Sequence, residues 1–371
     1  MRILIAGDFC PRGRLLLLIE KKEYESVFTD VREITHHVDW AIVNLECPVS
    51  NKQPIPIRKY GGHLFCTHRS VEALRWAGFN CVTLANNHFL DYGEEGVANT
   101  LEACQKYGID VVGGGRNLQE AARILYKEIN GQTLAVINCC EHEFSIATEL
   151  TAGSNPLNPI QQYYAIQEAK QNADYVLVIV HGGHEYYQLP SPRMQETYRF
   201  FVDAGADAVV NHHQHCYSGY EVYNGKPIFY GLGNFCFDKA SSHSGMWTEG
   251  YAVTINFTLD NLNFIIHPYR QCAQKPDVEM LETGTFDAKL MELNSVIVDS
   301  SLLERETRKY YKITSGIQSN IFEPINNRVY LSAKARGWLP SLISNTRKLK
   351  AQDFVCCESH RDKLIYWLKN T

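Results

Sequence analysis

The stretch YVLVIVHGGHEYYQ, residues 175–188, decides the fold class of this chain. Its first six residues are apolar and mostly β-branched or aromatic, which is typical of a buried strand. His181-Gly182-Gly183-His184-Glu185 follows at once, and its glycines let the backbone approach a ligand closely. Because ligands bind at the carboxyl ends of strands in α/β folds, this stretch predicts a strand that ends in a functional site.

The same order, an apolar run followed by polar side chains, occurs at four other places. They are Gly7-Asp8 after 1–6, Asn44-Leu45-Glu46 after 40–43, Asn86-Asn87-His88 after 81–85, and His212-His213-Gln214-His215 after 208–210. Each place supplies Asp, Glu, Asn or His, which are side chains that bind hard or borderline divalent metals. Five such places in one chain predict a single shared metal site.

The spacing of apolar residues between these places predicts an α/β fold. Helical segments are expected at 27–38, 68–77 and 93–107, alternating with strands. Three turn signals, Asn130-Gly131, Asn224-Gly225 and Asp260-Asn261, separate strand-like runs and predict antiparallel hairpins. A purely parallel sheet is therefore disfavoured, and we expect a two-sheet sandwich with outer helices. The segment 151–159 is expected to be a loop, either at the rim of the site or as a surface connection.

Composition limits the classes of function. The chain has 371 residues with 36 Lys and Arg against 41 Asp and Glu, and a net charge of −5 argues against general nucleic-acid binding. No apolar run approaches the roughly 20 residues of a membrane span, and no signal peptide is recognised at the N-terminus, so a cytoplasmic location is expected. The twelve cysteines contain no CxxC pair and are expected to be reduced and mostly buried.

The polar clusters differ in the roles that they suggest. His213 and His215 are two residues apart, so in an extended segment they point the same way and His212 points away. His181 sits directly at its strand end, and Asn87 can coordinate through its carbonyl oxygen. The expected metal ligands are Asp8, Glu46, Asn87, His181, His213 and His215. This set is sufficient for two divalent ions of Mn, Zn or Fe, with Glu46 as the bridging carboxylate.

The last hundred residues lack such clusters. Residues 286–312 and 341–369 have mainly helical patterns rich in Lys, Arg and Glu. We therefore expect one domain over 1–270 that holds the site and a mainly helical C-terminal extension over 271–371.

Taken in order, these motifs resemble the CapA family of poly-γ-glutamate capsule synthesis proteins, whose fold is similar to that of calcineurin-like metallophosphatases. The matching segments are Gly7-Asp8, Asn44-Leu45-Glu46, Ala85–His88 with Asp91–Gly93, His181–Tyr186, Asp203–His215 and Gly225–Phe235. The resemblance implies a four-layer αββα sandwich and a metal-dependent hydrolase scaffold. Within these segments His88, His184 and Glu185 are the expected catalytic residues, and Asn86, Asp91, Tyr186 and Asn234 the expected substrate contacts.

The chain departs from the metallophosphatase pattern at several positions. Those enzymes usually carry a His two residues after the first Asp, where this chain has Cys10. A neutral thiol is a poorer ligand, so the first metal is expected to be coordinated differently or held more weakly. Glu46 takes the place of a shorter bridging Asp, and His181-Gly182-Gly183 that of the more usual His-Trp-Gly.

Three hypotheses about function follow. The first is a two-metal hydrolase of a phosphate ester, in which His88 assists the leaving group. The second is an accessory protein in the synthesis of poly-γ-glutamate or another anionic capsule polymer. The third is a scaffold that only binds partners. The expected substrate is therefore a small molecule or an anionic polymer.

Overall fold

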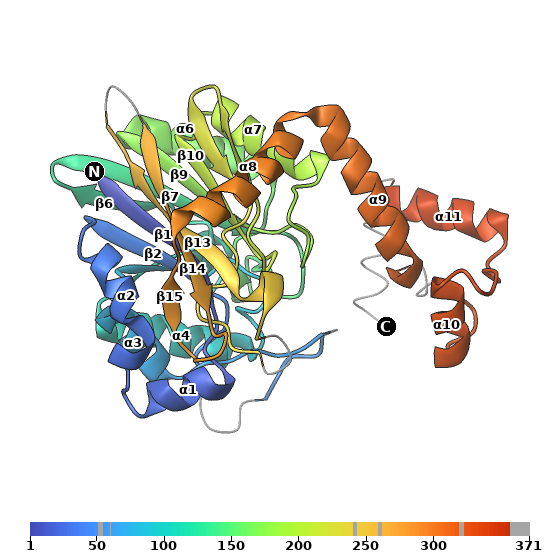
Figure 1. Ribbon diagram of the computed structural model, residues 1–371, viewed down its shortest axis with the longest axis horizontal. Helices are drawn as coiled ribbons and strands as arrows, with labels where there is room; N and C mark the ends of the chain where they lie inside the picture. The colour runs from blue at the N-terminus through green and yellow to red at the C-terminus, as the bar shows by residue number, and fades with distance from the viewer. Residues whose placement is uncertain (51–54, 60, 240–242, 259–261, 319–322, 357–371) are drawn as a thin grey trace. The chain divides into compact units, whose positions relative to one another are not determined.

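Two β-sheets form the centre of the compact unit Met1–Leu303, and helices cover their outer faces (Figure 1). The computed structural model describes residues 1–50, 55–59, 61–239, 243–258, 262–318 and 323–356. The first sheet has the order β15-β14-β13-β1-β2-β3-β4. Its strands are β1 (Arg2–Phe9), β2 (Trp40–Leu45), β3 (Cys81–Thr83), β4 (Asp110–Val112), β13 (Glu249–Asn256), β14 (Asn263–Gln271) and β15 (Val278–Met280).

The second sheet has the order β11-β12-β10-β9-β7-β6. Its strands are β6 (Leu125–Ile129), β7 (Gln132–Cys140), β9 (Tyr175–His181), β10 (Ala208–His212), β11 (Tyr220–Tyr223) and β12 (Lys226–Phe229). The strands β1 to β4 are mutually parallel, and so are β7, β9, β10 and β12. Parallel neighbours place their carboxyl ends at one edge, which is where the five polar clusters fall.

The layers follow from the alternation of side chains along each strand. In β1, Ile3 and Ile5 join Leu177 and Val210 of the second sheet in the core between the sheets. The intervening Leu4 packs instead with the helices on the outer face of the first sheet. These are α1 (Gly13–Glu20), α2 (Glu25–Thr35), α3 (His68–Trp76) and α4 (Gly93–Tyr107).

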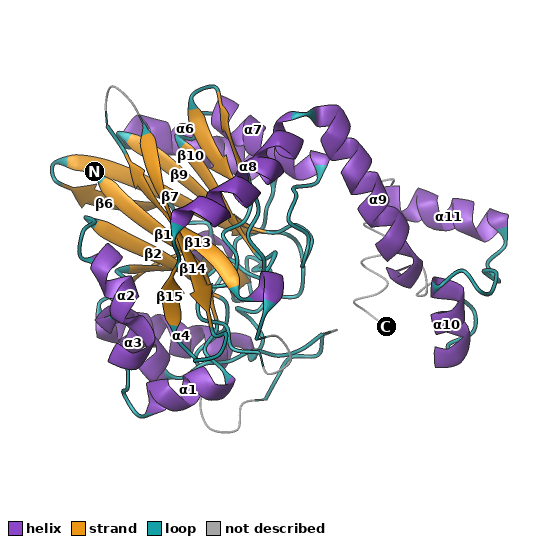
Figure 2. Ribbon diagram, in the orientation of Figure 1, coloured by secondary structure: helices purple, strands orange, loops and turns teal. Residues whose placement is uncertain are grey.

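The outer face of the second sheet has a core of its own, in which α6 (Pro159–Asn172) and α7 (Pro192–Asp203) take part. The result is helices, sheet, sheet and helices, the four-layer αββα sandwich that was expected (Figure 2). Short elements complete it: α5 (Leu118–Ala121), the paired strands β5 (Gly114–Gly115) and β8 (Gly153–Ser154), and a 3-10 turn at Gly245–Trp247.

The predicted hairpins are present. Asn130-Gly131 joins β6 to β7, and Asn224-Gly225 joins β11 to β12. β13 and β14 also pair antiparallel, but their turn at 259–261 lies outside the described residues. The predicted helix 93–107 ends as expected at Gly108, which takes a left-handed φ of 63°.

The interpretation of 151–159 as a surface connection is wrong for most of the segment. Residues 152–157 are buried, and Gly153–Ser154 forms β8. The Ser154 hydroxyl bonds the carbonyls of Leu84 and Asn86, at 3.2 and 2.9 Å. The segment therefore holds the Asn86-Asn87-His88 loop in place.

The chain divides into two compact units, Met1–Leu303 and Glu304–Thr371. The first extends past the boundary expected at residue 270, because β15 pairs with β14 and α8 (Thr283–Val298) buries Phe286 and Leu290 in the core between the sheets. The domain boundary expected at residue 270, between 1–270 and 271–371, remains a prediction. The unit boundary falls within α9 (Ser300–Gln318), and the second unit also contains α10 (Arg328–Ala335) and α11 (Asn345–Cys356). None of the helices in the described parts of the chain is long and apolar enough to cross a membrane.

An ion pair between buried Asp238 and partly exposed Arg14 fixes the loop that follows Asn234. The Asp238 side chain, 3% exposed, accepts hydrogen bonds from the Arg14 backbone at 2.7 Å and from its guanidinium at 2.8 Å. Burial alone would raise the pKa of Asp238, but the hydrogen bonds and charge of Arg14 outweigh it and lower that pKa below its ordinary value of 3.8. The pair ties the start of α1 to the loop near the site.

We expect Asp238→Asn to lower the free energy of unfolding at pH 7. A carboxyl whose folded pKa is lowered adds stability above its unfolded pKa and loses it as the pH falls through the folded pKa. The difference between wild type and variant should therefore be full at pH 7 and shrink below about pH 4. Urea unfolding of wild type and variant at pH 7 and pH 3 measures this difference in stability. The exposed Asp287→Asn is the control. An equal difference at pH 7 and pH 3 would contradict this origin.

Candidate metal centre

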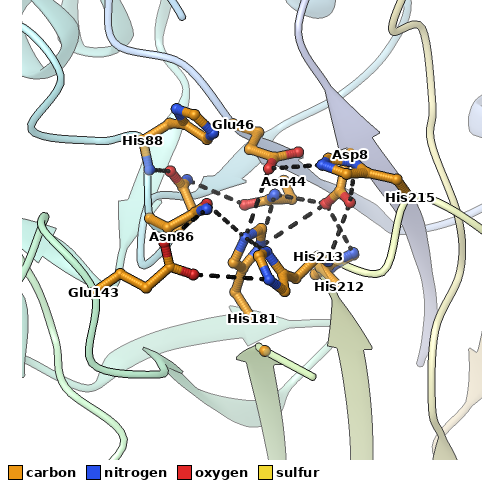
Figure 3. A network of polar contacts seen from close by, with 12 residues as sticks. Asp8, Asn44, Glu46, Asn86, His88, Glu143, His181, His212, His213 and His215 are labelled. Carbon is orange, nitrogen blue, oxygen red and sulfur yellow. Dashed lines mark hydrogen bonds and ion pairs between the residues drawn. The ribbon is translucent and has the colours of Figure 1, made fainter. Parts of the chain in front are cut away.

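The strand ends of both sheets meet in one buried polar cluster (Figure 3). Asp8 comes from the end of β1 and Glu46 follows β2, while His181 ends β9. Asn87 lies in the loop after β3, and His213 and His215 lie in the loop after β10. All six expected metal ligands are at most 7% exposed. The structure therefore brings them together, and their role as ligands remains a prediction.

A glycine allows the first of these residues to reach its place. A Cβ on Gly7 would lie 1.9 Å from the carbonyl oxygen of Gly233, so a larger residue would push the two backbones apart. With glycine, Asp8 N–H donates to that carbonyl at 3.1 Å, and Asp8 forms a bridge with Asn234. The register of β1 on β2 also shifts between Ala6 and Asp8, which turns Asp8 toward the cluster.

Glu46 is the least satisfied group of the cluster. It is fully buried, and neither carboxylate oxygen has a hydrogen-bond partner in the described structure. Its nearest basic groups are His181 Nε2 at 3.7 Å and His215 Nε2 at 3.6 Å from Oε1. Burial, followed by the charge of Asp8, raises the pKa of Glu46 well above its ordinary value. A buried carboxylate without a partner is costly, and a bound cation would satisfy it.

Asp8 is better supported than Glu46. Its Oδ1 accepts from the Asn44 amide at 2.7 Å, and its Oδ2 accepts from the His213 backbone N–H at 3.1 Å. Burial raises the pKa of Asp8 to about 6, although these two hydrogen bonds oppose the shift. His215 Nδ1 lies 3.7 Å from Oδ2, so the carboxylate faces the imidazoles.

Burial favours the neutral form of two of the histidines, His181 and His215. His181 Nε2 lies 3.0 Å from His213 Nδ1 and 3.1 Å from the side-chain oxygen Oδ1 of Asn87. Burial, then the charges of His213 and other neighbouring histidines, lower the pKa of His181 well below its ordinary value. Burial likewise lowers the pKa of His215 to about 3. Neutral imidazole is the form that binds a metal.

His215 is oriented by groups outside the cluster. Its Nδ1 lies 2.9 Å from the side-chain oxygen Oδ1 of Asn234, and the side-chain amide of Asn234 donates to the backbone carbonyl of His215 at 3.1 Å. The rings of Trp247 and Phe237 pack on it at 5.0 and 5.3 Å between centres. Asn234 is 0% exposed, so the structure shows it positioning His215, and its expected contact with substrate stays a prediction.

Two overlapping sets of donor atoms fit divalent ions. Glu46, His181 and His213 form one set, and Asp8, Glu46 and His215 form the other. In each set the donor atoms lie within 4.8 Å of one another, and all five residues are buried. Both sets contain Glu46, whose unpartnered oxygens a cation would satisfy, and mixed carboxylate and imidazole donors suit Mn, Zn or Fe. The residues present therefore fit the expected metal centre.

His88 lies beside the cluster on a buried support. Its Nδ1 is 2.7 Å from Asp91 Oδ2, and Asp91 also pairs with Lys59 and accepts from Leu64 N–H at 2.7 Å. Asp91 is fully buried and holds His88. The ion pair of Lys59 with Asp91 was not anticipated from the sequence. Burial is the main cause that lowers the pKa of His88. Asn86 is also fully buried, and its side-chain oxygen Oδ1 accepts from the His88 backbone N–H at 3.1 Å.

The remaining predicted residues lie at the rim. Glu185 is exposed, and its charge contributes to the raised pKa of Glu46. Tyr186 is 43% exposed, with its ring 6.2 Å from that of His215. His184 is partly buried, and burial lowers its pKa. The catalytic roles of His184 and Glu185 and the substrate contact of Tyr186 remain predictions.

Three cluster residues were not among the expected ligands. His212 was expected to point away, and this is wrong: it is 1% exposed with Nδ1 at 3.6 Å from Asp8 Oδ1. Asn44 links Asp8 to His181 through its amide nitrogen. Glu143 lies beside His213, at 3.8 Å. Asn44 could have been found from its strand-end position, but nothing near Glu143 in the sequence marks it.

Cys10 takes no part in either donor set. It is 1% exposed and packs in the core between the first sheet and its helices. Burial, followed by hydrogen bonds to the Cys10 and Cys66 thiols, raises the pKa of Cys47 well above its ordinary value. The position that usually carries a histidine is therefore part of the apolar core.

An αββα sandwich with carboxylates and histidines gathered at its strand ends defines a protein of the metallophosphatase-like class. Within that class, the chain belongs to the family described as bacterial capsule synthesis protein PGA_cap, whose model matches residues 2–239.

Two curated relatives come from Bacillus. The capsule biosynthesis protein CapA of Bacillus anthracis is 34% identical over 243 residues, covering 63% of this chain and 59% of the relative. The PGA biosynthesis protein CapA of Bacillus subtilis (strain 168) is 37% identical over 236 residues, covering 63% and 62%. The chain thus spans about three fifths of the length of these relatives. A crystal structure of a 5'-nucleotidase precursor from Thermus thermophilus gives a TM-score of 0.46 at 9% identity, covering 79% of this chain and 57% of that one.

We expect Glu46→Gln to leave the metal-free protein as stable as wild type or more stable, because the change removes a buried charge without a partner and keeps its shape. Added Mn²⁺ or Zn²⁺ should raise the Tm of wild type, and the variant should lose most of that rise. Thermal unfolding with and without chelator, together with metal content by mass spectrometry, measures both effects. The exposed Glu128→Gln is the control, and a variant that retains wild-type metal content would contradict the expectation.

Proposed function

We propose that this chain is a metal-dependent hydrolase that acts on a phosphate ester through two divalent ions. The observation that carries the proposal is Glu46, a buried carboxylate without a hydrogen-bond partner among the described residues that belongs to both donor sets. A site built only for structure would pair such a group within the protein. Glu46 lies between His181 and His215, so its carboxylate would be shared by two ions bound to the two donor sets.

The cluster residues would hold the two ions and orient the groups that bind them. One ion would be held by Glu46, His181 and His213 with the nearby Asn87 carbonyl, and the other by Asp8, Glu46 and His215. Two ions in such a site neutralise the charge of an ester and promote attack by water. The Asn44 amide keeps Asp8 oriented, and Asn234 does the same for His215.

His88 is the group that handles the leaving-group proton. Asp91 holds its Nδ1, at 2.7 Å, so Nε2 is the nitrogen that faces a substrate. Lys59 neutralises Asp91 in the same buried network. Asp91 holds the ring orientation of His88, as a carboxylate partner does for catalytic histidines in general, and Lys59 Nζ also lies 3.2 Å from the same Nδ1.

A second candidate is an accessory role in the synthesis of poly-γ-glutamate or another anionic capsule polymer. The names of the two Bacillus relatives favour it, since both describe capsule or PGA biosynthesis. In this role the same centre would act on the polymer or a precursor of it. The two candidates differ in the bond that is cleaved, phosphate ester against amide.

We expect the purified full chain to hydrolyse p-nitrophenyl phosphate, to lose this activity in chelator and to regain it with Mn²⁺ or Zn²⁺. His213→Ala should lower kcat at least roughly 10²-fold, because it removes a donor from one set, whereas exposed His36→Ala should not change it. A parallel assay with γ-glutamyl p-nitroanilide and poly-γ-glutamate separates the second candidate. A chain that neither contains nor binds a transition metal would rule out both.

His88→Asn should lower kcat roughly 10²–10⁴-fold with little change in KM, since the proton is needed only as the leaving group departs. The loss should be large for an alkyl phosphate and small for p-nitrophenyl phosphate, whose leaving group needs no proton. Steady-state kinetics on the two substrates measures the difference. Equal losses on both would assign His88 a structural role.

A further inference from the structure

Lys239 lies next to the metal centre but belongs to neither donor set. Its ammonium donates to the Tyr186 hydroxyl at 3.0 Å and lies 4.5 Å from the centre of the Trp247 ring. Trp247 packs on His215 at 5.0 Å and on Tyr186 at 5.9 Å between ring centres. The Lys239 ammonium therefore lies on the Trp247 ring, which in turn packs on His215, a residue of one donor set.

The charge of Lys239 is not neutralised by a carboxylate in the described structure. The carboxylate of its neighbour Asp238 contacts Arg14 at 2.8 Å and His243 at 3.3 Å instead. The other lysine near the centre, Lys59, is paired with Asp91. Aromatic faces stabilise an ammonium without cancelling its charge, so Lys239 keeps its full charge for an approaching anion.

The groups around Lys239 are anchored from several directions. The Trp247 indole N–H donates to the Phe237 carbonyl at 2.9 Å, and the Tyr186 backbone N–H donates to the Gln214 carbonyl, inside the histidine loop, at 2.8 Å. Arg14 holds Asp238, the residue just before Lys239. The cation is thus part of a preformed surface, which reduces the ordering cost of binding an anion.

The two ends of the centre differ in charge. Figure 3 shows Glu143 at the His213 end, and its carboxylate lies 3.8 Å from His213 Nε2. Lys239 stands at the His215 end, where its charge is among the causes, after burial and the charge of His213, that lower the pKa of His215. An anionic group outside the centre is therefore favoured beside His215 and repelled beside His213.

We propose that Lys239, with Tyr186 and Trp247, binds a second anionic group of the substrate, apart from the group held by the metal centre. The inference rests on the proposed function and specifies its substrate as one with two negative groups. Lysine is a compact charge that accepts either carboxylate or phosphate oxygens, and the Tyr186 hydroxyl adds a second hydrogen-bonding group.

Three non-hydrolysable probes test this site by calorimetry on the Mn²⁺-loaded full chain. They are butylphosphonate, with one anionic group, 4-phosphonobutyrate, with an added carboxylate, and 1,4-butanediphosphonate, with a second phosphonate. We expect a probe with two groups to bind about fivefold more tightly than butylphosphonate or better. A greater gain for 4-phosphonobutyrate assigns the site to carboxylates, and a greater gain for the diphosphonate assigns it to phosphates.

Lys239→Met should remove this gain and leave the Kd of butylphosphonate within about twofold of wild type. Lys239→Arg should keep most of the gain, and Lys22→Met, which removes a lysine paired with Glu72, is the matched control. Equal binding of all three probes to wild type, or a gain that persists in Lys239→Met, overturns the proposal. Because the probes are not cleaved, a chain that shows the gain but hydrolyses no phosphate ester would retain the Lys239 site and lose the hydrolase assignment.

Discussion

The unpaired carboxylate of Glu46 is the constraint on which the rest of the site depends. Its oxygens are buried with no donor among the described residues, and the nearest nitrogens belong to histidines whose pKa values are lowered by burial. Neutral imidazoles at 3.6 and 3.7 Å do not compensate the negative form of this carboxyl, and burial therefore raises its pKa well above the ordinary value. Burying this group without a partner therefore lowers the stability of the metal-free protein, and the apolar cores must offset the loss. A cation bound beside Glu46 would remove this cost.

Much of this arrangement could be predicted from the sequence, because strand ends are well marked. Asp8, Glu46 and His181 each follow an apolar run, and parallel strands in two facing sheets carry these ends to one edge. The hairpin turns at Asn130-Gly131 and Asn224-Gly225 were equally visible. Such features depend on local patterns of a few residues, and local patterns are what a single sequence records.

Features that depend on long-range contact were missed or explained wrongly. His213 and His215 do lie together, but the extended backbone that was expected of them is absent, since their φ values are 94° and 56°. The strand ends at His212, and the chain then turns so that all three histidines face the carboxylates. The pairing of Lys59 with Asp91, 32 residues apart, likewise leaves no periodic signal in the sequence.

The position two residues after Asp8 shows how the fold can replace a motif residue. Cys10 follows β1 in the apolar core, its backbone N–H donates to the Cys236 carbonyl at 3.2 Å, and it belongs to neither donor set. His212, from the other sheet, presents a buried nitrogen 3.6 Å from the same Asp8. Neither of its ring nitrogens has a hydrogen-bond partner among the described residues, as is also true of the Glu46 oxygens. Buried polar atoms without a partner, the Glu46 oxygens and the His212 ring nitrogens, therefore gather at the edge where the two sheets meet. His212 reaches this edge from 204 positions beyond Asp8, and a cation bound there would satisfy the Glu46 oxygens.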